Sequence, residues 1–115
     1  MPRDDAIVLD IVLACRRIRR FAAGFSRETF LADDKTQSAI VHQLQIIGEA
    51  TKRLTTAFQE SHAEVPWRDI ARMRDRLIHH YDAVDLDEVW KTTKTDIPDL
   101  LARLEPLVPD SEPEQ

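Results

Sequence analysis

The chain has 115 residues, of which 43% are hydrophobic, 32% are charged and only two are glycine. A single domain of this length buries about two-thirds of its unfolded surface, and this composition favours a compact helical protein over a sheet protein or a disordered chain. The net charge is −5, but residues 1–104 carry 16 positive against 17 negative charges, which excludes the overall basic character of a duplex-binding domain. We therefore expect an all-α protein, an up-and-down bundle of four to five helices.

The sequence also predicts a reducing, aqueous compartment. Cys15 has no second cysteine with which to form a disulfide, and it falls among apolar residues, as a buried thiol does. No stretch reaches the ~20 apolar residues of a membrane span, and the first five residues lack the basic start of a signal peptide. We expect a cytoplasmic protein.

The first predicted helix begins at a cap provided by Asp4 or Asp5 and ends near Ala23, with Gly24 just beyond it. Its apolar face consists of Ile7, Ile11, Ala14, Ile18 and Phe21. Its last turns carry cations, which complement the helix dipole, at Arg16, Arg17, Arg19 and Arg20. Solvated charge and contact with an RNA backbone both account for this cluster.

The next segment, residues 25–32, is predicted to be a connector that packs over the end of the bundle, followed by an N-cap at Asp33 or Asp34. A second helix is predicted over residues 35–59. Its apolar seam steps by three and four residues along Ile40, Leu44, Ile47, Thr51, Leu54 and Phe58. Gly48 costs this helix about 1 kcal/mol relative to alanine. We expect another helix or a bound group to approach the backbone there.

Residues 67–81, WRDIARMRDRLIHHY, read as a third helix that starts just after Pro66. One stripe of this helix consists of Trp67, Ile70, Arg74, Leu77, Ile78 and Tyr81. Arg74 then lies on an apolar face, so it needs a carboxylate, a subunit interface or an anionic ligand. Glu49 is the natural carboxylate, and a buried Glu49–Arg74 pair that only fixes helix register is an alternative to a functional role.

The opposite face of the same helix is polar and consists of Arg68, Arg72, Asp75 and His79. Asp75 lies one turn before His79 and can form a hydrogen bond with it. Residues five apart on a helix point about 140° away from each other, so one straight helix does not direct both Arg74 and His79 at one ligand. Either the helix ends near His79 or two copies of the chain combine.

A fourth helix is predicted to start at Asp85 and to place Trp90 in the core. Pro98 cannot donate to the carbonyl of Lys94, so we expect a kink or a break near Asp96.

The helical domain is expected to cover residues 1–108, and the acidic residues 109–115 to form a disordered tail. His42 and His62 are expected to be ordinary surface or interface histidines, so no metal site is predicted.

Arg74, His79 and Tyr81 together form the pattern R-x4-H-x-Y. Four further features stand around it at Ile47-Gly48-Glu49-Ala50, Trp67, Val84-Asp85 and Trp90. This ordered set resembles the HEPN-domain ribonucleases of the HepT toxin type, and the resemblance covers most of the chain, to about Leu104. His80 is a departure, because members often carry Asp there, and it changes the local charge.

The resemblance implies a HEPN-like bundle and a two-fold dimer that brings two histidines to one site. The residue chemistry suits RNA cleavage, because a histidine with an ordinary pKa of about 6.5 exchanges a proton near neutrality and an arginine binds phosphate oxygens with a fork of donors. We expect a metal-independent endoribonuclease. Arg74 and His79 are its predicted catalytic residues, Asp75 orients His79, and Glu49 and His80 support the site.

The resemblance also implies a partner. In HepT-type systems a nucleotidyltransferase antitoxin transfers AMP from ATP to the tyrosine of the motif, here Tyr81, and so neutralises the toxin in a type VII-like toxin–antitoxin pair. ATP and Mg²⁺ are used by that partner, and no cofactor is expected for the chain itself. The competing reading is a non-catalytic helical binding or dimerisation subunit of a two-component nucleotidyltransferase, with Arg74 and His79 serving only the interface.

Overall fold

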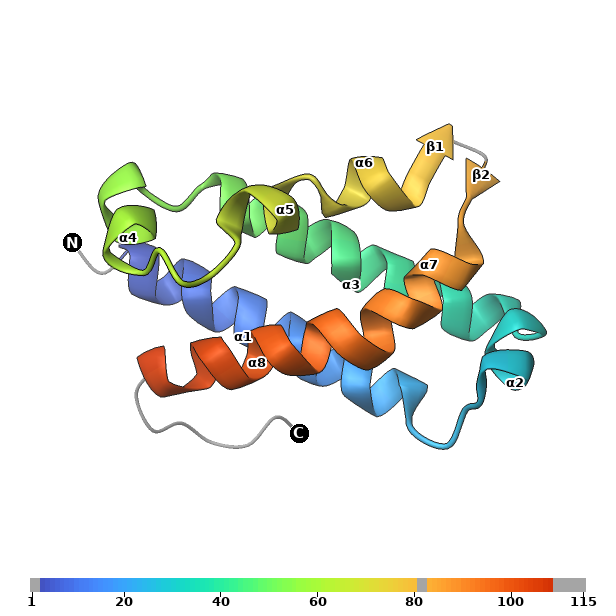
Figure 1. Cartoon of the computed structure of the whole chain (residues 1–115). Coiled ribbons are helices and arrows are strands. Elements are labelled where there is room, and N and C mark those ends of the chain that lie inside the picture. The colour runs from blue at the N-terminus through green and yellow to red at the C-terminus, as the bar shows by residue number, and fades with distance from the viewer. Residues whose placement is uncertain (1–2, 81–82, 109–115) are drawn as a thin grey trace.

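The computed structural model describes residues 3–80 and 83–108, without the side chains of His79 and His80. It confirms the all-α bundle and adds one short β-ribbon (Figure 1). In chain order the elements are α1 (Arg3–Ala22), α2 (Arg27–Leu31), α3 (Asp34–Lys52), α4 (Thr56–Ser61), α5 (Trp67–Ala71), α6 (Met73–Leu77), β1 (Ile78–His80), β2 (Ala83–Val84), α7 (Leu86–Lys91), the π-helical turn η1 (Thr92–Asp96), α8 (Ile97–Leu104) and the 3-10 turn η2 (Glu105–Leu107).

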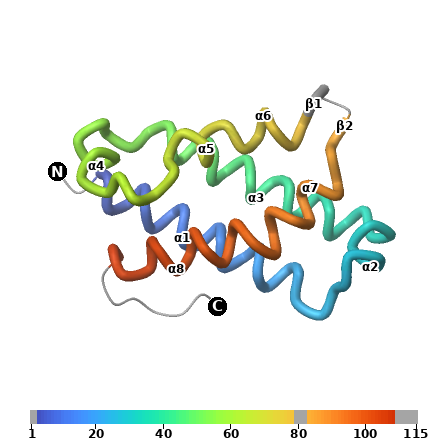
Figure 2. The backbone as a smooth tube through the Cα atoms, in the orientation of Figure 1, coloured from blue at the N-terminus to red at the C-terminus, as the bar shows by residue number. Residues whose placement is uncertain are grey.

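The two long helices α1 and α3 form the centre of the bundle and run antiparallel (Figure 2). α8 packs against α1, whereas α5 and α6 pack one after the other against α3. None of the described helices is long and apolar enough to cross a membrane. The bundle therefore has two sides, one formed by α1 with α8 and the other by α3 with α5 and α6.

The core is one continuous cluster that joins all the longer helices. α1 buries Ile11 and Ile18 completely, as predicted for the apolar face of the first helix, and it also buries Val12, which was not predicted. Burial of each such side chain contributes about 1.5–3 kcal/mol. Phe30 of α2 is also fully buried and its ring lies 5.0 Å from that of Trp90, so the predicted connector contains a short helix that closes one end of the core.

Side-chain caps fix where several helices begin. Asp33 caps α3 by accepting a hydrogen bond from the amide of Thr36, and Asp85 caps α7 by accepting one from the amide of Glu88, as predicted. Such a cap stabilises a helix by typically ~1 kcal/mol. Gly24 follows α1 with a φ of 82°, the left-handed conformation that lets the chain leave the helix.

Two predicted boundaries were wrong. α1 already contains both Asp4 and Asp5 in its first turn, so neither is the N-cap of the first helix. The second helix ends at Lys52 rather than at residue 59, because the chain leaves the helix and restarts with Thr55 as the cap of α4. Asp4 accepts hydrogen bonds from both the amide and the hydroxyl of Thr55, at 3.0 and 2.7 Å. A contact between distant parts of the sequence therefore fixes this break.

The link between Asp4 and Thr55 predicts a measurable pH effect. The amide of Thr55, and then its hydroxyl, stabilise the charged carboxylate and lower the pKa of Asp4 from its ordinary value of 3.8. A lowered pKa in the folded chain means that the stabilisation is present above pH 3.8 and is lost as the pH falls through the folded pKa. An NMR titration should place the midpoint of Asp4 below 3.8 in the wild type and nearer 3.8 in Thr55→Val. Thr55→Val removes only the hydroxyl and keeps the amide, so an unchanged midpoint in the variant would show that the hydroxyl is not a cause.

In place of the kink or break predicted near Asp96, the chain forms a π-helical turn that joins α7 to α8. η1 occupies residues 92–96, and the amide of Ile97 donates to the carbonyl of Thr92, five residues earlier. Pro98 follows at the start of α8, where its missing N–H removes no required bond. The wider π-helical turn thus accommodates the proline without ending the helix.

Cys15 is completely buried on α1, as predicted. Burial, with a smaller effect of the negative charge of Glu105, raises the pKa of its thiol to about 12. Because the thiolate is the reactive form, this cysteine is a packing residue in the folded chain.

Candidate active site

The segment that carries the R-x4-H-x-Y pattern is not one helix. α5 ends at Ala71, the chain bends at Arg72 with φ −96° and ψ 4°, and α6 then ends at Leu77. The prediction of a continuous helix over residues 67–81 was therefore wrong. No glycine or proline stands at the bend. The bend keeps both α5 and α6 in contact with α3.

The bend changes which side chains are buried. Trp67, Ile70, Leu77 and Ile78 are buried as predicted. Met73, one residue before Arg74, is also buried. The Arg74 side chain is instead 43% exposed, so its predicted place on an apolar face is wrong.

The guanidinium of Arg74 is held only weakly. Its nearest carboxylate among the described residues is that of Asp75, with 3.6 Å between Nη1 and Oδ1, and the Asp75 side chain is 72% exposed. An exposed pair of this kind contributes between 0 and about 1 kcal/mol. Arg74 is therefore accessible to solvent and to an anionic ligand.

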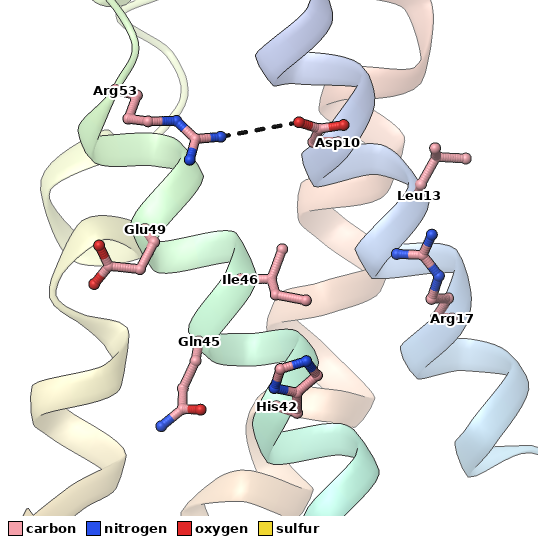
Figure 3. A pocket seen from close by; sticks show the side chains of 8 residues that line it. All are labelled: Asp10, Leu13, Arg17, His42, Gln45, Ile46, Glu49 and Arg53. Atoms are coloured by element: carbon pink, nitrogen blue, oxygen red, sulfur yellow. Dashed lines mark ion pairs between the residues drawn. The ribbon is translucent and has the colours of Figure 1, made fainter.

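The predicted ion pair between Glu49 and Arg74 is not formed. Glu49 lies on the exposed face of α3, and its carboxylate is 3.7 Å from the ammonium of Lys52. Figure 3 shows this carboxylate directed away from the neighbouring pair of Asp10 and Arg53. Because Arg74 is exposed, it needs no buried counter-ion, and the supporting role predicted for Glu49 is not realised through Arg74.

Gly48 does mark a close approach between helices. A methyl group at Gly48 would lie 3.6 Å from the carbonyl oxygens of both Ile70 and Ala71. The last turn of α5 thus rests directly on α3, which is the first of the two alternatives predicted for this glycine. The contact fixes the start of the segment that carries Arg74.

The chain continues from α6 into the β-ribbon, where His79 has an unusual place. β1 and β2 are antiparallel, with Ile78 paired to Val84 and His80 paired to Ala83. β1 therefore has one more residue between these pairs than β2, and that residue is His79. Bulges of this kind bend the strand and occur often beside active sites. The amide of Asp85 donates to the carbonyl of Leu77 at 2.8 Å and closes the base of the ribbon.

The remaining predicted site residues are placed only in part. Asp75 lies on α6 and His79 on β1, so the one-turn helical relation predicted between them does not exist. The backbone of His80 is paired in the ribbon, but its side chain lies outside the described structure. Tyr81 lies outside the described residues. Its predicted alignment with Arg74 depended on a continuing helix, and α6 ends before it.

Two hollows along α3 were not predicted. One, of about 360 Å³, lies between α1 and α3 and includes Arg17 and Ile46 (Figure 3). The other, of about 430 Å³, lies between α3 and the residues around β2, including Val84. His42 and Gln45 border both hollows, since they lie on the same exposed side of α3.

The histidines outside the pattern have simple surroundings. His42 is exposed, as expected of a surface residue. The ring of His62 packs 4.3 Å from that of Phe58, and its Nδ1 lies 3.1 Å from the Phe58 carbonyl oxygen. The indole of Trp67 donates to the backbone carbonyl of His62. His62 therefore helps to join α4 to the start of α5.

Comparison with known proteins decides the family. The model of the family described as "Ribonuclease HepT-like" matches residues 11–107, which include α3, α5, α6 and the β-ribbon. The chain belongs to the HepT-like ribonuclease family. The resemblance that the sequence pattern indicated is therefore confirmed.

Individual relatives extend the match over most of the chain. A Thermococcus cleftensis protein named "Probable ribonuclease HepT" is 48% identical over 98 residues, covering 85% of this chain and 89% of the relative. A "Putative RNase" of Caldanaerobacter subterraneus is 42% identical, covering 78% and 80%. Another "Putative RNase", from Methanocaldococcus jannaschii, is 35% identical, covering 99% and 96%. No solved structure matches the chain.

Proposed function

We propose that this HepT-like chain is a metal-independent endoribonuclease whose reaction is carried by His79 and Arg74. The observation that carries the proposal is the change of backbone between these residues. Arg74 is exposed and weakly paired on α6, and His79 follows as the extra residue of a β-bulge rather than on the far side of a helix. The 140° separation expected on one straight helix therefore no longer applies.

The proposed reaction is attack of an RNA 2′-oxygen on the adjacent phosphorus. The 2′-hydroxyl loses its proton to a histidine, the bond from phosphorus to the 5′-oxygen breaks, and the leaving oxygen takes a proton from an acid. The products are a 2′,3′-cyclic phosphate and a 5′-hydroxyl. Arg74 stabilises the extra negative charge on the phosphorane through its fork of donors.

Asp75 has a proposed orienting role toward His79. Its carboxylate is 3.6 Å from Arg74, so it also stands beside the proposed phosphate-binding group. A phosphate displaces Asp75 from Arg74 in this scheme, because a dianionic transition state is the stronger partner for a guanidinium. Asp75 is thereby freed to interact with a protonated histidine.

The proposed active unit is a two-fold dimer. One histidine serves as the base and the other as the acid, which a single motif does not supply by itself. The Arg74 side chain is solvent-accessible on α6, which is compatible with two copies meeting there.

The proposed control is covalent. A nucleotidyltransferase antitoxin, using ATP and Mg²⁺, transfers AMP to the hydroxyl of Tyr81, and pyrophosphate leaves. The added phosphodiester carries negative charge close in sequence to His79, where it would compete with RNA for Arg74. The chain is thus proposed to be the toxin of a type VII-like toxin–antitoxin pair.

Metal removal tests the core of this proposal. Purified full-length chain should cleave single-stranded RNA equally well with and without EDTA, because a histidine and an arginine supply the proton transfer and the charge stabilisation. Mass analysis of the fragments should find 2′,3′-cyclic phosphate and 5′-hydroxyl ends. Loss of cleavage in EDTA with recovery on adding Mg²⁺, or fragments with 5′-phosphate ends, would refute the mechanism.

A further inference from the structure

A small hollow of about 150 Å³ lies where the end of α1 meets η1. Its walls come from Arg19, from residues 22–24 at the end of α1, and from Thr93, Lys94 and Pro98. It is on the side of the bundle that carries α1 and α8, whereas α6 and β1 lie on the α3 side (Figure 1). The hollow is therefore separate from the Arg74 and His79 segment.

The charge of this hollow is unbalanced. Arg19 and Lys94 both line it and no carboxylate does. The hollow that contains Arg17 also contains Asp10, and the one that contains Arg76 also contains Asp96. Within residues 3–80 and 83–108, Arg19 has no hydrogen bond or ion pair, and the one contact of Lys94 is with the ring of Trp90, at 5.3 Å. Arg19 and Lys94 are both exposed, and two positive charges beside one hollow favour an anion over a cation there.

Thr93 is a second and independent sign of a missing ligand. Its side chain is only 3% exposed, and its hydroxyl is the one buried side-chain oxygen of the described structure without a hydrogen-bond partner. Leaving such a group unpaired is unfavourable, and most buried hydroxyls in proteins do have a partner. Thr93 is one of the residues that line the hollow, so an oxygen of an anion bound there is the acceptor that we infer for this hydroxyl. The π-helical turn that contains Thr93 is also a geometry found often at functional sites.

We propose that the hollow binds one phosphate of the RNA strand, at a position away from the linkage that is cleaved. Its volume is below the ~300 Å³ at which sites for whole small molecules begin, so it fits a phosphate group and not a nucleoside. The inference rests on the proposed function, which supplies RNA as the partner. An RNA long enough to reach both sites gains the second contact, and a very short RNA does not.

Binding of an RNA that cannot be cleaved tests this site. The probe is a fluorescent single-stranded RNA with 2′-O-methyl groups, because the attacking hydroxyl is then blocked, and the readout is anisotropy at several salt concentrations. Arg19→Ala should weaken binding about three- to tenfold and should make the slope of log K against log salt less steep by about 0.7, the value for one phosphate of a single strand. Arg19→Lys should retain most of the affinity.

Arg3→Ala is the matched control. Arg3 is also an exposed arginine on α1, about 24 Å from Arg19 at 1.5 Å per residue, and its loss should leave affinity and slope unchanged. The double variant Arg19→Ala with Lys94→Ala should change the slope by no more than about 0.7 in total, because both cations bind the same phosphate. A loss of twice that value would show a diffuse basic surface and would overturn the single site.

Thr93→Val separates binding from folding. It removes only the unpaired hydroxyl, so it should weaken binding of the long RNA while the melting temperature does not fall. Equal effects of Arg19→Ala and Arg3→Ala would refute the site. Inorganic phosphate that binds in the hollow without competing with the labelled RNA would also refute it. Failure of the proposed function is distinct, because it would appear as absent cleavage while the blocked RNA still binds through Arg19.

Discussion

Replacement of His79 or Arg74 by alanine should lower the rate of RNA cleavage by about 10² or more, while the chain remains folded. This is the usual effect of removing one acid–base group or one group that stabilises charge in a transition state. Arg74 is exposed and its ion pair with Asp75 is weak, so its loss has little effect on stability. The measurement is the single-turnover rate with a labelled RNA, together with a thermal melt.

Arg76→Ala is a close control for Arg74→Ala. Both arginines lie on α6, their side chains are 44% and 43% exposed, and each has a carboxylate at 3.6 Å. Only Arg74 belongs to the proposed site, so Arg76→Ala should cleave RNA at the wild-type rate. Similar losses for the two variants would mean that general charge on α6, rather than one phosphate contact, supports the reaction.

Replacement of Tyr81 by phenylalanine should abolish modification and leave cleavage intact. The phenol oxygen is the proposed acceptor of AMP, and phenylalanine has no nucleophile there. After incubation with the nucleotidyltransferase, ATP and Mg²⁺, intact mass analysis should show one or more added AMP groups on the wild type and none on Tyr81→Phe. The variant should also continue to cleave RNA in the presence of the partner.

Two outcomes would contradict this regulatory proposal. Equal modification of Tyr81→Phe would place the acceptor elsewhere in the chain. Inhibition of an unmodified wild type would show that the partner blocks the site by occupying it. The proposal rests on the sequence pattern, because the alignment of Tyr81 with Arg74 along a helix is lost once α6 ends at Leu77.

Local signals in the sequence predicted much of the fold. The caps at Asp33 and Asp85 and the glycine after α1 each depend on residues within one or two turns. The break after Lys52 was missed because its cause is not local. Thr55 is held by Asp4, 51 residues away in the sequence, and a periodic apolar pattern does not reveal such a bond.

The geometry of the candidate site was predicted less completely than the fold. A helical pattern was extended through Ile78 and His79 into a region that forms a strand. β-Branched and aromatic residues favour strands over helices, and this was a signal for the change. The exposure of Arg74 follows from the bend at Arg72, which has no glycine or proline to mark it.

Because of the β-ribbon, the stability of the bundle and the activity proposed for the site depend on different residues. Its two short strands have no third neighbour, and an isolated pair of strands is marginally stable in water. The buried side chain of Ile78 and the bond from Asp85 to Leu77 hold it against the bundle. Substitutions deep in α1 would thus reduce how many molecules are folded without altering the turnover of each one. Substitutions at the base of the ribbon would lower the turnover of each molecule without reducing how many molecules are folded, since local opening there leaves the bundle intact.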